Sequence, residues 1–442
     1  MTTYRCPVCG YLHSGNITFH FCPVCNSAAQ AFLPDTTADN YGGWDSKTRN
    51  LIHSMAATGK VFLEGKGSGR KFVCMDDLLF LPSQINRLPL EGGAEVATAV
   101  TLGKKTKVPV ILQTPVLNAA MSYGALSREA KMALALGSSL AGTIANTGEG
   151  GMLDEERQLA KRLTLQYSTG RFGISAERLK LADMIEIKIS QGAKPGMGGK
   201  LPGVKVTAEI AAARHIPMGK TAHSPAVHPD IRNGSDLSDK ILELRRLTGG
   251  KPIAVKIVGG HLEADLKTIF NQKNIPDVLV IDGGEGGTGA APVTIKDHVG
   301  LPLIYSLPRV SDFLDREKLR DRVTLICAGG IRHPGDIAKA LALGADGVYM
   351  GGALKIALGC TYLRECHLGS CPYGIATQDG NLTRRLHVKE AATRVANFIS
   401  AATEEVKDIC RICSKSSIHE LCREDLTCLD PELSRITGIP MA

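Results

Sequence analysis

From about residue 109 onward, short β-rich runs alternate with amphipathic helical runs, and this alternation restricts the fold more than any other feature. Eight strand-and-helix units in about 290 residues match the size of a TIM barrel. A doubly wound open sheet is the alternative, because periodicity alone does not close a barrel. The predicted strands are 116–120, 143–146, 184–189, 253–258, 278–281, 303–306, 324–328 and 347–350. Helices are predicted at 127–140, 262–271 and 334–343, with Ser127 as the cap of the first.

A glycine pair follows each of the last two predicted strands, Gly329-Gly330 and Gly351-Gly352. The loops after strands seven and eight form the phosphate site of many barrels, because glycine lets backbone N–H groups approach an anion. Lys256 ends an apolar strand, so we expect its ammonium group in the barrel mouth, where it would stabilise negative charge on a reduced flavin. The alternatives are ordinary turns and a lysine whose head group reaches solvent.

The glycine-rich run 282–289 follows the fifth predicted strand and indicates a flexible loop against a flat ligand, with Gly284, Gly287 and Thr288 as contacts. It is not a Rossmann fingerprint, because no dinucleotide-binding βαβ unit surrounds it.

Most of the 13 cysteines fall in three clusters. Clustered thiols in a cytosolic chain bind metal more often than they form disulfides. The predicted ligands are Cys6, Cys9, Cys22 and Cys25 in the first cluster, Cys360, Cys366 and Cys371 in the second, and Cys410, Cys413, Cys422 and Cys428 in the third.

Each cluster predicts a different centre. The first forms two Cys-Pro-Val-Cys knuckles, which suit tetrahedral coordination of iron or zinc. The second ends in Cys371-Pro372, and three thiolates would leave one cubane corner empty, which favours [3Fe–4S] over [4Fe–4S]; three buried thiols are the alternative. The third is predicted either to hold a [4Fe–4S] cluster or to consist of buried cysteines.

Five runs in order resemble the FMN-binding synthase domain of glutamate synthase: 119–130, 145–157, 185–206, 282–292 and 366–379. The resemblance spans roughly residues 48–430 and implies that FMN and a [3Fe–4S] cluster share one barrel. The cluster would pass electrons to FMN, which would reduce 2-iminoglutarate, formed from 2-oxoglutarate and ammonia, to L-glutamate. Residues 1–34 separately resemble the rubredoxin domain of rubrerythrins, so iron is favoured over a structural zinc ribbon.

The resemblance also implies roles for single residues. Lys188 and Arg214 would bind the substrate carboxylates, with Lys194 and Glu149 near the reacting centre. The alternatives are structural ion pairs for the first two and a helix-capping role for Glu149. The implied FMN contacts are Met121, Ser122, Gln191, Lys256, Gly329, Gly330, Gly351 and Gly352.

Lys200 and the segments 223–230 and 259–263 depart from the usual family pattern, which leaves the amino donor and acceptor open. Thr2 stands where an amidotransferase would expose a cysteine nucleophile, so the nitrogen would come as ammonia or from glutamine through a separate amidotransferase subunit. An FAD–NAD(P)H reductase or a ferredoxin would supply electrons. The competing hypotheses are amine exchange of the N-methylglutamate synthase type and a non-catalytic electron-transfer adaptor.

The predicted domains are a rubredoxin-like domain at 1–34, a linker and connector at 35–108, the FMN-binding barrel at 109–400 and a cysteine-containing segment at 401–442. The net charge of +8 comes from scattered basic residues, which favours small anions or acidic electron-transfer partners over nucleic acid. No apolar run is long enough for a membrane helix and no secretory signal is evident, so we expect a cytoplasmic protein. We also expect the protein to form an oligomer.

Overall fold

The computed structural model describes residues 3–6, 12–14, 20–24, 26, 28, 33–34, 46–63, 65, 67–289 and 291–442. The chain divides into two compact units, Met1–Leu63 and Glu64–Ala442. In the first unit, β1 (Thr3–Arg5), β2 (Leu12–Ser14) and β3 (Leu33–Pro34) form an antiparallel sheet in the order β2-β1-β3, and α1 (Ser46–Thr58) follows.

The second unit is built on eight parallel strands in the order β7-β16-β15-β14-β13-β10-β9-β8. The strands are β7 (Val116–Asn118), β8 (Ala145–Asn146), β9 (Leu163–Tyr167), β10 (Met184–Lys188), β13 (Ile253–Val258), β14 (Val278–Asp282), β15 (Thr324–Ala328) and β16 (Gly347–Met350). The Asn118 N–H donates to the Ile144 carbonyl across the remaining gap at 3.2 Å, so the barrel is nearly closed. The TIM barrel is therefore confirmed, and the doubly wound sheet is excluded.

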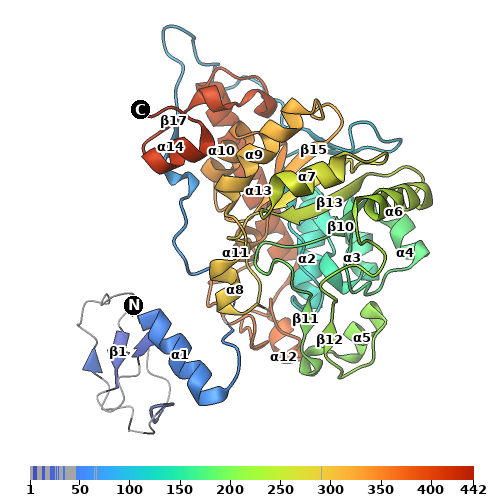
Figure 1. Cartoon of the computed structure of the whole chain (residues 1–442), viewed down its shortest axis with the longest axis vertical. Helices are drawn as coiled ribbons and strands as arrows, with labels where there is room; N and C mark the ends of the chain where they lie inside the picture. Colours follow the sequence, from blue (N-terminus) through green and yellow to red (C-terminus); the bar gives the residue numbers. More distant parts are fainter. Residues whose placement is uncertain are drawn as a thin grey trace. The chain divides into compact units, whose positions relative to one another are not determined.

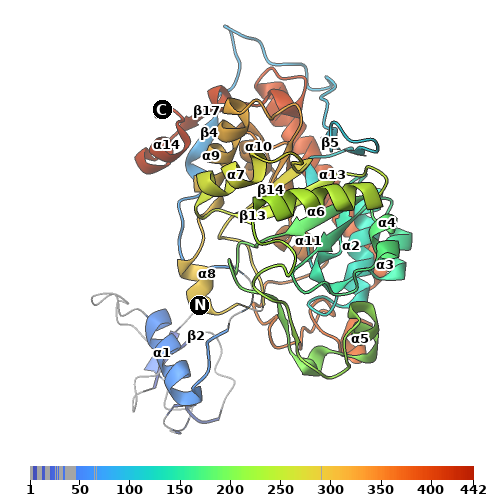
Figure 2. The ribbon, with the colours of Figure 1, turned by 45° about the vertical axis from the view of Figure 1, so that its right-hand side comes forward.

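Helices make up much of the rest of the second unit, and Figures 1 and 2 show α6, α7 and α9 outside strands β13 and β14. They are α2 (Arg128–Leu140), α3 (Asp154–Leu159), α4 (Ala176–Leu181), α5 (Ala208–Arg214), α6 (Gly234–Leu247), α7 (Leu262–Phe270), α8 (Val293–His298), α9 (Leu303–Arg316), α10 (Pro334–Ala342), α11 (Gly352–Ala357), α12 (Gly380–Thr383), α13 (Val388–Ile412) and α14 (Pro431–Thr437). The three predicted helices are confirmed as α2, α7 and α10, and the Ser127 side chain caps α2 by accepting from the Ala130 N–H at 3.1 Å. No helix among the described residues is long and apolar enough to cross a membrane.

Two strand predictions need correction. The predicted strand at 303–306 is wrong, because these residues form the first turn of α9, where Leu303, Ile304 and Leu307 are buried at helical spacing. Strand β9 was missed, because Thr164 and Gln166 interrupt its apolar run; both are buried in the structure. The two errors cancel in the count, so β15 and β16 remain strands seven and eight, but the run 282–289 follows the sixth strand.

Shorter elements join the connector to the rest of the second unit. Strand β4 (Leu78–Phe80) pairs with β17 (Leu426–Cys428), and β5 (Val100–Leu102) pairs with β6 (Val110–Leu112). Beside the barrel mouth, β11 (Lys200–Leu201) pairs with β12 (Ala222–His223). The part of the connector from residue 67 onward and the C-terminal segment therefore pack on the barrel core.

Helices α2 and α13 approach closely at Gly137, which is buried in α2. A methyl group at Gly137 would lie 2.8 Å from the Ala392 carbonyl oxygen and 2.8 Å from Val395 Cβ. These distances are shorter than any normal contact, so the glycine allows the two helices to pack at this separation.

We expect Gly137→Ala to lower the free energy of unfolding by about 1–3 kcal/mol, because overpacking outweighs the gain in helix propensity of about 1 kcal/mol. Urea unfolding followed by circular dichroism measures this change. Gly380→Ala is the matched control, since no atom lies within 4 Å of its added methyl group. Equal stability of the two variants would contradict the close packing of α2 on α13.

Candidate functional site

A cavity of about 380 Å³ lies at the carboxyl ends of the barrel strands. It collects most of the site residues predicted from the sequence. They are Met121, Ser122, Glu149, Lys188, Gln191, Lys194, Arg214, Lys256, Gly287, Thr288, Gly329, Gly330, Gly351, Gly352, Cys360, Cys366 and Cys371. Gly284 is not among the lining residues, and its N–H donates to the Leu301 carbonyl at 2.9 Å.

Glu149 lies among cations on one wall of the cavity. Its carboxylate is 2.6 Å from Lys188 Nζ and 3.9 Å from Lys194 Nζ. Burial alone would raise the pKa of Glu149, but Lys188, Lys194 and Arg214 outweigh burial and hold the pKa at about 2. A side chain at Gly199 would collide with this carboxylate, so the backbone leaves room for it. Glu149 is therefore a partly buried, ionised carboxylate, and Lys188 is its ion-pair partner.

Arg214 is buried at the end of α5 and has capacity to bind an anion. Its Nη2 donates to the Tyr123 carbonyl at 2.6 Å, and its guanidinium lies 5.3 Å from the centre of the Phe172 ring. Among the described residues, Arg214 Nε has no hydrogen-bond partner and the side chain has no ion pair. Burial lowers the pKa of Arg214, and the charge of Glu149 opposes this shift. A carboxylate entering the cavity would satisfy the remaining donors.

Lys256 lies at the floor of the cavity, 5% exposed, so its head group does not reach solvent. Its Nζ is 3.0 Å from Asp282 Oδ2 and 5.8 Å from the centre of the Tyr349 ring. Burial would lower the pKa of Lys256, but Asp282 and Glu186 raise it further than burial lowers it. Lys256 therefore stays protonated at the floor of the cavity as one half of an ion pair with Asp282.

The two glycine pairs form a wall without side chains. Gly329 and Gly330 have φ angles of +98° and +76°, which favour glycine. A methyl group at Gly329 would lie 2.8 Å from the Gly283 backbone, and one at Gly352 would meet open space. Bare backbone in the same cavity as a buried lysine fits a flat cofactor with an anionic end.

Three half-buried cysteines, Cys360, Cys366 and Cys371, line the same cavity. Lys205 Nζ anchors their loop by donating to the carbonyls of Cys366 and His367 at 3.3 and 3.2 Å. Sulfur ligands on one loop, beside the glycine pairs, fit an iron–sulfur cluster next to that cofactor.

The remaining cysteines differ from this arrangement. Cys410, Cys413 and Cys428 are fully buried in the apolar core, and burial raises the pKa of Cys410 to about 12 and that of Cys413 to about 11. The Cys422 thiol lies 3.4 Å from Asp425 Oδ2. Of the two alternatives predicted for the third cluster, the burial of Cys410, Cys413 and Cys428 matches that of buried cysteines.

In the first unit, Cys6 and Cys22 are buried, with 0% and 2% of their surface exposed. Cys9 and Cys25 lie outside the described residues.

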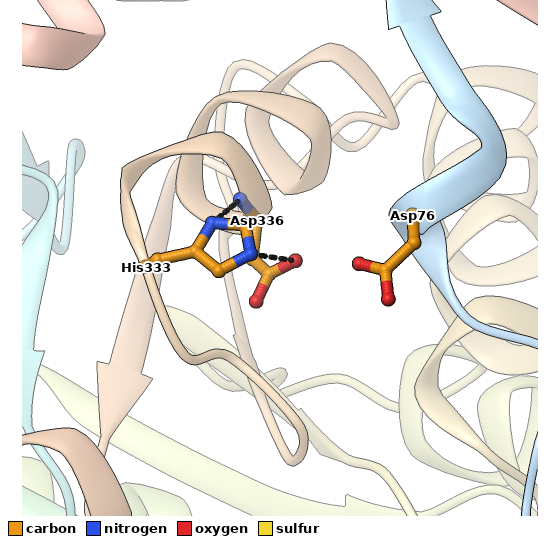
Figure 3. A group of neighbouring side chains, drawn as sticks. All are labelled: Asp76, His333 and Asp336. Carbon is orange, nitrogen blue, oxygen red and sulfur yellow. Dashed lines mark hydrogen bonds and ion pairs between the residues drawn. The ribbon is translucent and has the colours of Figure 1, made fainter.

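One further group of possible ligands consists of Asp76, His333 and Asp336, whose ligand atoms lie within 4.8 Å of one another. Figure 3 shows the two carboxylates turned toward each other beside the imidazole ring. Arg332 already supplies the opposite charge, because its Nε is 2.9 Å from Asp336 and its Nη2 bonds Asp76. The group therefore anchors the loop after Gly330 rather than forming a metal site.

Comparison with known proteins decides the family. Residues 55–415 match the family model described as the conserved region in glutamate synthase. The chain belongs to the glutamate synthase family. Residues 4–32 also match the rubredoxin-like domain of rubrerythrin, as the cysteine knuckles predicted.

Curated members of the glutamate synthase family are similar over most of their length. The chain is 40% identical to a glutamate synthase large subunit-like protein of Rhizobium meliloti (strain 1021), over 92% of this chain and 96% of that protein. It is also 40% identical to an archaeal-type glutamate synthase [NADPH] of Thermotoga neapolitana, over 81% of this chain and 75% of that protein. The barrel superposes on a mandelate oxidase variant with benzaldehyde, with TM-score 0.51 and 17% identity, over 82% of this chain and 91% of that one. This last similarity shows the fold alone.

Glu285 is a cavity residue to which the sequence assigned no role. Both of its carboxylate oxygens accept from the Leu303 N–H, at 2.9 and 3.1 Å, at the start of α9. Burial raises the pKa of Glu285 to about 7. The sequence could not place this contact, because 303–306 was predicted to be a strand. In the structure Glu285 joins the glycine-rich loop to α9 beside the glycine wall.

The raised pKa of Glu285 has a consequence for stability. The folded chain holds this proton more tightly than the unfolded chain, so the free energy of unfolding should fall as pH rises from about 4.5 to 7. Glu285→Gln removes the titration, and we expect the variant to gain about 2–3 kcal/mol on the wild type between pH 5 and 8. Urea unfolding across this range measures the difference. A constant difference at all pH values would contradict the burial of an ionisable Glu285.

Proposed function

We propose that this chain catalyses the reductive amination of 2-oxoglutarate to L-glutamate through 2-iminoglutarate, as the synthase component of a glutamate synthase. The observation that carries the proposal is one cavity lined by buried cations, by the two glycine pairs and by the three-cysteine loop. Relatives named archaeal-type glutamate synthase [NADPH] support it, and they do not favour the amine-exchange or adaptor hypotheses.

The charge balance of the cavity wall suits a dicarboxylate. Lys188, Lys194 and Arg214 supply three positive charges, and Glu149 supplies one negative charge, which leaves two positive charges uncompensated. The two carboxylates of 2-oxoglutarate would neutralise this excess. Arg214 is the best placed to hold one of them, since its Nε points to no partner among the described residues.

Glu149 would bind the incoming ammonium and accept a proton from it. Because its pKa is held at about 2, the carboxylate stays ionised at neutral pH and can hold an ammonium ion. The same carboxylate can accept a proton as ammonia attacks the keto carbon. Lys188 and Lys194 flank it and would stabilise the negative charge that develops on the keto oxygen.

The chain's own residues would hold the cofactors. We assign the FMN phosphate to the two glycine pairs, the isoalloxazine ring to Met121, Ser122 and Gln191, and a [3Fe–4S] cluster to Cys360, Cys366 and Cys371. When bound, FMN supplies the hydride and the cluster passes electrons to FMN. Lys256 would stabilise negative charge on the ring. The knuckle cysteines of the first unit would bind one iron, and we propose a structural role for the third cysteine group.

The partners follow from what the reaction consumes. We propose that nitrogen arrives as ammonia, released from glutamine by a separate amidotransferase subunit. An NAD(P)H-dependent FAD reductase or a ferredoxin would supply the electrons, and the relatives named glutamate synthase [NADPH] favour NADPH.

The direct test uses anaerobically purified full-length protein whose iron, acid-labile sulfide and FMN have been quantified. The reduced protein is mixed with 2-oxoglutarate and ammonium, and flavin reoxidation and glutamate are measured together. Glutamate should form in proportion to the flavin reoxidised. Protein with full FMN and cluster content that makes no glutamate would overturn the proposed function.

We expect Arg214→Lys to weaken 2-oxoglutarate binding by about 1–3 kcal/mol, because lysine keeps the charge but loses the two-pronged contact with a carboxylate. The measurement is the 2-oxoglutarate dependence of flavin reoxidation, with FMN content unchanged. The control is Lys200→Met at the exposed rim of the cavity, which should have a smaller effect. An unchanged 2-oxoglutarate dependence in Arg214→Lys would remove Arg214 from the binding site.

Cys366→Ser should abolish the electron paramagnetic resonance signal of a [3Fe–4S] centre while FMN stays bound, because one of three ligands is lost. Reduction by an external donor should slow, whereas chemically reduced flavin should still form glutamate. Cys74→Ser is the control, since Cys74 is exposed and does not line the cavity. A wild-type spectrum in Cys366→Ser would show that the loop does not bind the cluster.

A further inference from the structure

A second cavity, of about 590 Å³, lies at the amino-terminal ends of the barrel strands. Its lining segments lead into strands: 245–250 precedes β13, 273–277 precedes β14, and Arg322 precedes β15. Residues 105–107, between β5 and β6, complete it. This end of a barrel is opposite the carboxyl-end loops that form the candidate site, and the two cavities share no lining residue.

Positive charge dominates this cavity. Six cations line it: Lys105, Lys107, Arg245, Arg246, Lys273 and Arg322. Asp277 is the only acidic residue among the lining residues, and it is paired with Arg245 at 3.0 Å. Within the described part of the chain, the other five cations have no acidic partner within 4.0 Å. Cations gathered around a concave surface focus a positive potential into it.

The backbone holds part of this arrangement in place. Gly250 has a φ angle of +94°, and a methyl group there would lie 2.9 Å from Lys107 Cβ. The stem of Lys107 therefore packs on bare backbone at the edge of the cavity. Arg245 is also fixed, because it donates to the Ile275 carbonyl at 2.9 Å as well as to Asp277.

The shape and chemistry of the cavity indicate the class of ligand. Its volume falls in the range of about 300–1,000 Å³ that is usual for small-molecule sites. Arg246 and Arg322 offer guanidinium groups, which match phosphate oxygens in pairs, and the lysines add point charges. Leu242, Ile275 and Pro276 form one apolar wall, where an organic group could pack.

We propose that this cavity binds a small anion bearing two or more linked phosphate groups. The five cations without acidic partners neutralise the phosphate chain, and the apolar wall accommodates an organic portion where one is present. The site is independent of the proposed function, because binding requires neither FMN nor 2-oxoglutarate.

The test is isothermal titration calorimetry of the full-length holoprotein with inorganic tripolyphosphate at constant ionic strength. We expect saturable binding that weakens at least tenfold in the triple variant Lys105→Ala, Lys107→Ala and Lys273→Ala. The matched control, Lys161→Ala, Lys220→Ala and Lys389→Ala, removes the same charge from exposed lysines outside the cavity and should bind as the wild type does. Unchanged FMN content in both variants shows that they are folded.

A parallel titration with ATP identifies the source of the phosphate chain. Tighter binding of ATP than of tripolyphosphate would show that a nucleoside packs on the apolar wall. Equal binding would show that the site recognises the phosphate chain alone. The proposal fails if tripolyphosphate does not saturate, or if the control variant loses as much affinity as the cavity variant. It also fails if poly-glutamate binds through these lysines while tripolyphosphate does not, since the surface would then serve an acidic protein.

Discussion

The ammonium group of Lys131 joins the loops on which the candidate site depends. It is 1% exposed, pairs with Glu156 at 2.8 Å and donates to the carbonyls of Met121, Asn146 and Thr147 at 2.7, 2.9 and 3.1 Å. A buried charge without such partners costs several kcal/mol, so the three carbonyls and the carboxylate cannot separate independently. The loop after β7 and the loop that carries Glu149 are therefore held in one geometry.

The charges of the cavity are organised by the same rule. Lys256 is balanced by Asp282 at the floor and Lys188 by Glu149 on the wall, whereas Arg214 has no carboxylate partner among the described residues. A balanced lysine can remain charged while buried, as the raised pKa of Lys256 shows. An unbalanced arginine cannot lose its charge, so it favours the entry of an anion. Lys188 and Lys256 are thus held in ion pairs with carboxylates, whereas the charge of Arg214 is available to a ligand.

Local sequence pattern predicted the barrel, the glycine pairs and the cysteine loop, whereas the resemblance to the glutamate synthase domain implied most of the other site residues. Glycine pairs at strand ends and the spacing of cysteines can be recognised without knowing how the chain packs. In the structure Gly329, Gly351 and Cys366 line one cavity. The failures arose where tertiary context decided. The polar residues of β9 are buried inside a barrel, which no apolar pattern shows, and Leu303 begins a helix although its neighbours are β-prone. Glu285 was overlooked for the same reason, since its hydrogen-bond partner lies in that helix.

The net charge of +8 does not show where the basic residues gather, because that depends on the fold. In the sequence the basic residues are scattered, yet the barrel brings Lys107, Arg246 and Arg322 from three separate segments to one end. At the other end, Glu149 and Asp282 pair with Lys188 and Lys256, so acidic residues inside the catalytic cavity fix two of its lysines in place. The five cations without acidic partners are exposed, so solvent screens their mutual repulsion and leaves them available to an anion. The amino-terminal end of the barrel therefore carries a charge imbalance for which the reaction proposed at the carboxyl end does not account.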